Sequence, residues 1–285
     1  MRLTKNITIL ITLAIISSPD FIFAQQDTTE IEMMRLELND GSTLVGNIIE
    51  EDENTIIIRT LSNLEIKVPK AIIIEREIIK GQIEEGEFWH GDPNQTRMFF
   101  APTGKGLKAG EGYFAVYEIF FPFAAIGVTD WFTLAGGMSL LPGAEKQVFY
   151  LAPKFTPVQL TNFDASIGVI YAVIPDEDEG AGIAYGVATY GTEKATITLG
   201  LGFGFYGADF ADKPILVLGG ELRVSKSIKL LTENWFILSE KASLLTFGIR
   251  FFGENLAADF GLVYSSEWGG DGFPFFPWLG FAYNF

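Results

Sequence analysis

The chain offers few side chains that could carry out acid–base or nucleophilic chemistry. It contains one histidine, His90, and no cysteine. Histidine is the usual general base near neutral pH, but it must reach a serine or carboxylate partner to activate a nucleophile. His90 falls in a charged, glycine-containing stretch outside the apolar segments, so we interpret it as a surface residue and predict no enzymatic activity. The absence of cysteine excludes a disulfide framework and a cysteine-based metal site.

The most concentrated acidic cluster is the run Asp176-Glu177-Asp178-Glu179. Carboxylate oxygens are the ligands that hard divalent cations prefer. The run lacks the spaced ligands and the turn glycine of a dedicated cation-binding loop, so we interpret it as a solvated surface loop. We predict no metal ion and no cofactor.

A third set of charges lies inside apolar segments, where an unpaired charge is costly. It has five acidic and four basic members: Glu118, Lys154, Asp164, Glu221, Arg223, Lys229, Glu233, Arg250 and Asp259. Their near balance predicts an ion-paired interior, in which we expect Arg250 to meet Glu233. A charged constriction that selects small solutes is the alternative interpretation.

The composition indicates which elements must position these charges. The chain of 285 residues has a net charge of −16, 31 glycines and 14% aromatic residues. An acidic chain of this kind does not suit nucleic-acid binding, which needs basic surface to replace phosphate counterions. Abundant glycines and aromatics favour an all-β architecture with tight turns.

Residues 1–24 have the pattern of a secretory signal peptide. Arg2 and Lys5 are followed by an apolar run over residues 7–16 and by Ala24 at the expected cleavage site. A membrane anchor is the alternative, but the run is shorter than the span of about 20 residues that a bilayer requires. The longest other apolar stretch, residues 114–128, is interrupted by Glu118 and Pro122.

Residues 27–80 form a predicted small β-domain that a linker, residues 81–95, separates from the rest. Its five strands are expected at 31–38, 42–50, 55–60, 64–69 and 72–79, with a hairpin at Asn39-Asp40-Gly41. The stretches "NDGSTLVGNIIEEDENTIIIRT" and "IKVPKAIIIERE" resemble the small Sm-like barrels. RNA-binding members of that class carry basic loops, whereas residues 27–85 hold 14 acidic and 6 basic residues. We therefore expect a periplasmic spacer or partner-docking domain.

Residues 96–285 alternate apolar with small or polar residues, which predicts strands with one apolar face. The clearest example is "TITLGLGFGF" at residues 196–205. Short turns such as "GVTDWF" and "QLTNFD" recur about every 30 residues and alternate with longer loops, as in a membrane barrel. About twelve antiparallel strands result. Their expected spans are 97–103, 112–127, 131–140, 147–156, 162–174, 181–190, 195–205, 214–224, 228–238, 244–252, 256–264 and 277–285.

The final stretch, "WLGFAYNF", places Phe281, Tyr283 and Phe285 on one face of the last strand. It resembles the C-terminal strand of bacterial outer-membrane β-barrel proteins, and "GIAYGVATYGT" and "LTENWF" resemble stretches of porin-like proteins. The resemblance implies insertion into outer-membrane lipid after recognition by the barrel-insertion machinery.

Two functions are compatible with such a barrel. The first is a narrow channel or a small-solute binding or transport protein of the outer membrane. The second is a structural or assembly protein with a closed lumen, whose N-terminal domain docks a periplasmic protein. Glycines predicted to face the lumen would either leave a passage or admit bulky neighbours such as Tyr150 and Trp278. These glycines are residues 137, 168, 200, 202, 204, 219, 248, 261 and 280.

Overall fold

The computed structural model describes residues 31–84, 87–267 and 273–285. The predicted signal peptide, residues 1–24, lies outside this part of the chain. No helix among the described residues is long and apolar enough to cross a membrane. Two compact units are present, one spanning residues 26–91 and the other containing residues 92–285.

The N-terminal unit is a six-stranded antiparallel sheet with the order β4-β3-β2-β1-β5-β6. Gly41 adopts a φ of 82° in the turn between the first two strands, as the Asn-Asp-Gly sequence predicts. Leu36, Ile58 and Val68 form the centre of its core. The strands are β1 (Ile31–Leu38), β2 (Thr43–Glu51), β3 (Thr55–Thr60), β4 (Glu65–Pro69), β5 (Ile73–Glu84) and β6 (Glu87–His90), and a 3-10 turn (Lys70–Ile72) precedes β5.

The stretch expected to be a linker differs from the prediction. β5 continues to Glu84, and β6 pairs with it from Glu87 to His90. His90 is thus a strand residue, and its ring packs edge-on against Phe88 with a centroid distance of 5.2 Å. The sequence did not predict this hairpin, because it is rich in charged residues and glycine. The alternation of Ile83 and Phe88 with polar residues extends over too few positions to indicate strands.

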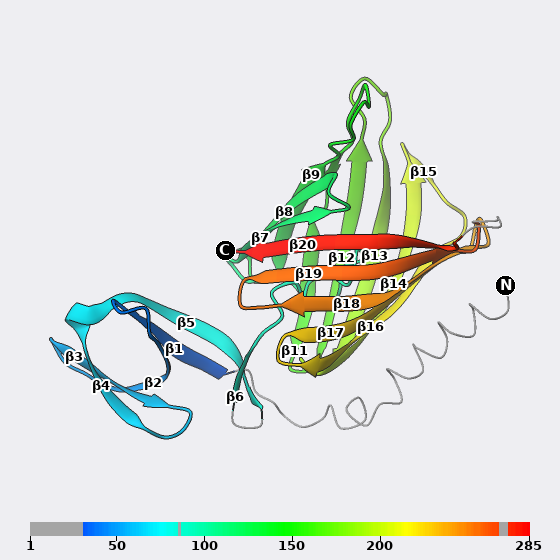
Figure 1. The fold of residues 1–285 in the computed structure, drawn as a ribbon. Helices are drawn as coiled ribbons and strands as arrows, with labels where there is room; N and C mark the ends of the chain where they lie inside the picture. The colour runs from blue at the N-terminus through cyan, green and yellow to red at the C-terminus, as the bar shows by residue number, and fades with distance from the viewer. Residues whose placement is uncertain (1–30, 85–86, 268–272) are drawn as a thin grey trace. The chain divides into compact units, whose positions relative to one another are not determined.

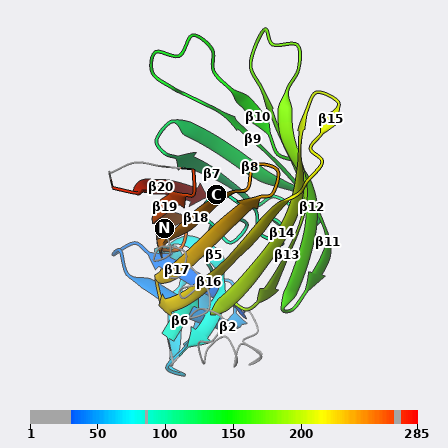
Figure 2. The same ribbon diagram turned by 90° about the vertical axis from the view of Figure 1, so that its right-hand side faces the viewer.

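The second unit is a closed antiparallel barrel (Figures 1 and 2). Neighbouring strands follow one another in sequence, and β20 pairs with β7 to close the wall. β10 and β11 occupy one position between β9 and β12, so the wall has twelve strand positions. Its strands are β7 (Gly112–Tyr117), β8 (Phe121–Thr129), β9 (Phe132–Met138), β10 (Phe149–Leu151), β11 (Lys154–Leu160), β12 (Phe163–Val173), β13 (Ala181–Gly191), β14 (Ala195–Tyr206), β16 (Ile215–Ser225), β17 (Ile228–Ile237), β18 (Ala242–Phe252), β19 (Leu256–Ser265) and β20 (Phe275–Asn284), and the short β15 (Asp209–Phe210) extends β14.

Three of the expected strands are wrong in detail. Residues 97–103 are not a strand. Residues 112–127 form two strands, because Glu118 and Ile119 adopt positive φ angles of 50° and 66° and turn the chain. Residues 147–156 are divided into β10 and the start of β11 at Pro153, which has no N–H group to donate to a ladder.

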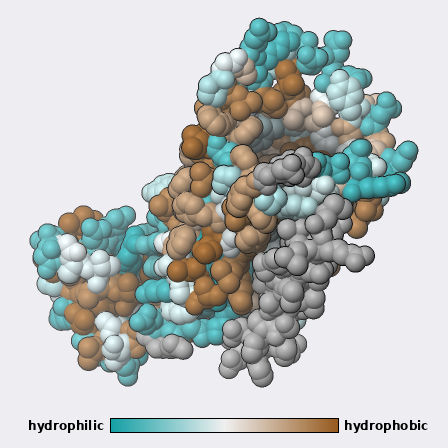
Figure 3. Space-filling view, turned by 45° about the vertical axis from the view of Figure 1, so that its right-hand side comes forward, coloured by the Kyte–Doolittle hydropathy of each residue, from teal (hydrophilic) through white to brown (hydrophobic). Residues whose placement is uncertain are grey.

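The period-two pattern places apolar residues on the outside of the barrel. Leu199 is 58% exposed on β14, whereas Thr198 beside it is fully buried in the lumen. Phe281, Tyr283 and Phe285 also point outward and are exposed. Hydrophobic residues cover much of the barrel wall in Figure 3, and hydrophilic residues gather at its loops. This distribution is the one expected for a wall in contact with lipid.

Closure of the wall predicts resistance to detergent. A barrel leaves no open strand edge at which unfolding can begin. An unboiled sample should therefore migrate differently from a boiled sample in a denaturing gel. Equal migration of the two samples would contradict the closed barrel.

The separate cores of the two units predict that the barrel folds without the N-terminal sheet. Deleting residues 27–90, with the N-terminal 26 residues retained, should give a protein that still inserts in the outer membrane and still shifts on boiling. Membrane fractionation followed by the gel assay tests this. Loss of insertion would assign the N-terminal unit a part in barrel assembly.

Candidate functional site

Residues 92–108, which we call the plug segment, lie inside the barrel and fill part of its lumen. Asn94, Met98 and Phe99 are almost completely buried. The Asn284 side-chain amide donates a hydrogen bond of 2.7 Å to the Pro93 carbonyl, and the Gly104 N–H donates one of 2.8 Å to Thr189. The segment is thus bound to opposite parts of the wall, on β20 and β13.

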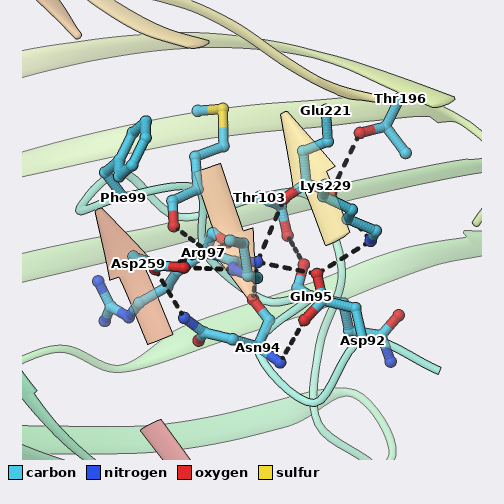
Figure 4. A network of polar contacts seen from close by, with 12 residues as sticks. Asp92, Asn94, Gln95, Arg97, Phe99, Thr103, Thr196, Glu221, Lys229 and Asp259 are labelled. Carbon is cyan, nitrogen blue, oxygen red and sulfur yellow. Dashed lines mark hydrogen bonds and ion pairs between the residues drawn. The ribbon is translucent and has the colours of Figure 1, made fainter. Parts of the chain in front are cut away.

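Arg250 on β18 is the centre of the contacts between plug and wall. Figure 4 labels three of its partners, Asp92, Glu221 and Asp259. Its side chain is fully buried. Nε lies 2.7 Å from Oδ1 of Asp259, and Nη2 lies 3.0 Å from Oδ2, so this pair is bidentate. Nη1 lies 2.9 Å from Asp92 in the plug and 3.4 Å from Glu221 on β16. Nη2 also donates to the carbonyl oxygens of Arg97 and Met98 at 3.2 and 2.6 Å.

Lys229 on β17 completes the network around Asp92. Its Nζ lies 2.9 Å from Asp92, 3.5 Å from Glu221 and 3.7 Å from Glu193. Burial alone would raise the pKa of Asp92, but Arg250 and Lys229 outweigh burial and hold this pKa below its ordinary range. Asp92 therefore stays ionised. Its carboxylate pairs with Arg250 and Lys229 and so attaches the plug segment to β18 and β17.

Two further predicted charges bind the plug through its backbone. Oε2 of Glu233 accepts the N–H groups of residues 99, 100 and 101 at 2.9, 3.0 and 3.0 Å. Lys154 donates to the carbonyl oxygens of Lys105 and Thr103 at 2.5 and 3.4 Å. Glu233 thus accepts backbone N–H groups of the plug segment, and Lys154 donates to its carbonyl oxygens. These hydrogen bonds satisfy backbone groups that are not paired in a strand ladder.

The remaining predicted charges lie elsewhere. Arg223 donates to the carbonyl oxygens of Ser225 and Lys226 at the β16–β17 turn. Asp164 is half-buried on β12. Glu118 lies in the β7–β8 turn, where it accepts the Leu279 N–H at 2.9 Å. The expected pairing of Arg250 with Glu233 is wrong, because Glu233 binds the plug backbone and Arg250 binds Asp259, Asp92 and Glu221.

Sequence reasoning missed Asp92, Asn94, Arg97 and Glu193. The first two were assigned to a linker, Arg97 was assigned to a strand and Glu193 lies in a short turn. The polar run "DPNQTR" before three apolar residues has no period of two, which was the available signal against a membrane strand.

Four of the nine predicted lumen glycines, residues 137, 168, 219 and 261, admit bulky side chains, whereas a Cβ at Gly204 would meet only a backbone oxygen at 3.9 Å. A Cβ at Gly219 would lie 2.1 Å from the Met98 Sδ, and one at Gly261 would lie 3.0 Å from the Phe99 ring. Gly137 and Gly168 make similar room for the Tyr150 and Tyr185 hydroxyl groups. These glycines therefore form recesses that receive the plug and neighbouring aromatic rings.

The acidic run at residues 176–179 lies in the β12–β13 loop. Lys146 approaches Asp176 and Glu177 at 3.9 and 3.7 Å. Within the described residues no group of three or more His, Cys, Asp or Glu side chains is arranged to hold a metal ion.

Comparisons with known proteins find matches among solved structures only. No protein-family model matches the chain, and a search of curated proteins finds no match. The KdgM porin in complex with disordered oligogalacturonate matches with a TM-score of 0.48 at 9% identity, over 61% of this chain and 98% of the porin. A loop L8 deletion mutant of OmpT, an outer membrane protein of Vibrio cholerae, matches with a TM-score of 0.35 at 10% identity, over 90% of this chain and 97% of the mutant. OprB of Pseudomonas putida matches with a TM-score of 0.31 at 10% identity, over 81% of this chain and 74% of OprB.

All three TM-scores are below 0.5, so the fold of this chain is described from its own strand pairings. The predicted all-β fold with an antiparallel barrel is confirmed by the closed wall with its twelve strand positions. The resemblance of residues 27–80 to Sm-like barrels stays a prediction. Fold and site together define a β-barrel whose lumen contains an internal, ion-paired plug.

The network predicts strong coupling between Arg250 and Asp259. Arg250→Ala should lower the free energy of unfolding by about 3–5 kcal/mol, because it leaves the buried carboxylate of Asp259 without its counterion. The double variant Arg250→Ala/Asp259→Ala should lose about 1–3 kcal/mol less than the sum of the two single variants. Urea unfolding in lipid vesicles measures these differences.

Glu118→Ala provides the matched control, since Glu118 belongs to the same predicted set and contacts none of these residues. Its effect should add to that of Arg250→Ala within about 0.5 kcal/mol. Additivity of the Arg250 and Asp259 changes would show that the two side chains do not interact.

Proposed function

We propose that the chain is an integral protein of the bacterial outer membrane that binds and takes up small solutes, with the plug segment closing its lumen at rest. The apolar outer face of the barrel and its outward C-terminal aromatics support a membrane location. On this proposal the short turns and the N-terminal unit are periplasmic, and the longer loops face the outside.

The observation that carries the proposal is the position of residues 92–108. A channel open to diffusion needs a continuous water-filled path through its wall. Here Met98 and Phe99 occupy recesses at Gly219 and Gly261, and Asp92 is bound by Arg250 and Lys229. On this proposal, movement of the segment opens the path for a solute.

The chemistry of the anchors supports a plug that can be released. Replacing a buried ion pair with well-packed apolar residues is often neutral or stabilising, so ionic anchors are a poor choice for a permanent seal. Charged groups are well hydrated once they separate, whereas apolar anchors would be exposed to water. Anchoring through Asp92, Glu221 and Arg250 thus suits a contact that opens and closes.

A second candidate is a structural protein whose lumen stays closed and whose N-terminal unit docks a periplasmic protein. Exposed apolar residues on β5 favour it, because Ile74 and Ile78 are 66% and 57% exposed. An apolar surface of this kind is typical of interaction sites.

A disulfide between plug and wall separates these candidates. A Cβ at Gly106 would lie 3.3 Å from the Thr156 Cβ on β11, close to the spacing of about 3.5–4.5 Å found in disulfides. The natural chain has no cysteine, so cysteines introduced at these two positions can pair only with each other within the chain. In planar bilayers with KCl, the wild-type protein should show a low resting conductance and voltage- or urea-induced openings. Oxidised Gly106→Cys/Thr156→Cys should open at least about tenfold less often, because the bond restricts the plug by about 2 kcal/mol or more.

The same double variant in its reduced form is the control and should regain the wild-type openings. A large, steady conductance that oxidation leaves unchanged would show that ions pass beside the plug and would contradict the gate. Absence of openings in all forms, including the wild type in urea, would favour the closed structural barrel.

A further inference from the structure

A cavity of about 410 Å³ lies in the lumen between the plug segment and the β7–β8 turn. Arg97 and Phe100 border it on the side of the plug segment, and Glu118 borders it at the turn. Its volume lies within the range of small-molecule sites. An apolar cavity of about 150 Å³ is enough to hold benzene, so this one has room for a molecule of about two aromatic rings.

The walls of the cavity are aromatic rings and small aliphatic side chains. Phe123 stacks on Tyr150 with a centroid distance of 5.8 Å, and Trp278 packs against Tyr117 at 6.0 Å. The aliphatic part of the lining comes from β12 and from the link between β10 and β11, and it consists of Ala152, Ile170 and Ala172. The two alanines leave the space that larger side chains would fill.

The polar groups of the aromatic residues are not available to a ligand. The Tyr150 hydroxyl donates a hydrogen bond of 2.9 Å to the Pro122 carbonyl. The Tyr117 hydroxyl and the Trp278 Nε1 are covered by surrounding atoms. These three side chains therefore present carbon surface to the cavity.

The two charged residues of the lining are also engaged by the protein. The Arg97 guanidinium lies against the Phe123 ring, with Cζ 4.2 Å from the centroid, and donates to the Tyr113 hydroxyl and the Phe100 carbonyl at 2.9 Å. Arg97 is only 7% exposed. Glu118 is half-buried and accepts the Leu279 N–H at 2.9 Å. An acid at this border disfavours anionic ligands.

We infer that the cavity binds an uncharged, apolar organic molecule of about two rings, an aromatic hydrocarbon or a compound of similar shape. Its rings pack against Phe123, Tyr150 and Trp278, and burial of its apolar surface drives binding. A charged solute would lose its hydration and gain no exposed partner from this lining, which disfavours it. Apolar cavities also hold water poorly, so an apolar molecule displaces little ordered water.

The inference deepens the proposed function by naming its class of solute, and it rests on that function only where the bound molecule is treated as cargo. Phe100 of the plug segment packs against Trp278 of the wall at 6.4 Å. A molecule in the cavity therefore lies against both the plug segment and the wall. The cavity is present with the plug segment in place, so binding can be measured independently of gating.

Equilibrium dialysis of the full-length protein in lipid nanodiscs tests the inference with naphthalene and its anionic counterpart 1-naphthoate. Empty nanodiscs give the background of partition into lipid. The protein should bind about one naphthalene per chain above this background, at least about tenfold more tightly than 1-naphthoate. Equal affinities for the two compounds, or no naphthalene above the background, would overturn the inference.

Three variants locate the bound molecule. Ala172→Phe should weaken naphthalene binding at least about tenfold, because the added ring occupies the cavity. Val173→Phe is the matched control, since it adds the same ring on the outer face of β12, where Val173 is 37% exposed, and should leave binding unchanged. Tyr117→Phe should also leave it unchanged, because the lost hydroxyl is covered. Equal losses at residues 172 and 173, or a loss in Tyr117→Phe, would contradict an apolar site in the lumen.

If Ala172→Phe fails to fold, as judged by the gel shift, photolabelling decides. Benzophenone, an uncharged probe with two rings, should crosslink on irradiation to lining residues such as Ile170, and excess naphthalene should suppress this product. Crosslinks confined to outward residues such as Ile167, which is 57% exposed, would overturn the inference. Naphthalene binding by the oxidised Gly106→Cys/Thr156→Cys variant separates the two proposals, because the cavity survives there even if the gating proposal fails.

Discussion

The fully buried guanidinium of Arg250 is the interaction on which the interior of the barrel depends. It joins β18 to β19 through Asp259, to β16 through Glu221 and to the plug segment through Asp92. A planar group with five donors can serve several acceptors in different directions, which an ammonium group cannot do with the same rigidity. This one side chain thereby joins three strands of the wall to the segment inside it.

Other residues of the lumen fit the plug segment in two ways, by small size at glycines and by charge at Glu233 and Lys154. Glycines 219 and 261 leave room for Met98 and Phe99, and Glu233 and Lys154 satisfy backbone groups of the plug segment. The segment has no ladder of its own, so these side chains replace the pairing that a strand would supply. Polar groups of the wall thus bind the backbone of the plug segment, and recesses at glycines receive its apolar side chains.

The sequence predicted the fold class and much of the wall because period-two alternation is a local signal. The predicted number of strands equals the observed number of strand positions because two errors cancel. Residues 97–103 were predicted as a strand and are not one, whereas β7 and β8 were predicted as a single strand. Met98 and Phe99 are apolar because they pack in a lumen, and a local pattern cannot distinguish that surrounding from lipid. The inward charges were identified by parity alone. Their partners were not, because Asp92 and Arg250 are brought together only by closure of the barrel.

The plug segment comes immediately before β7, and β7 is the strand with which the last strand, β20, pairs. The wall cannot become a complete ring until the final ten residues are in place, and by then residues 92–108 have been synthesised and lie next to the seam. The order of the elements therefore places the plug segment at the seam of the barrel, one residue range away from the strand pair that closes the wall.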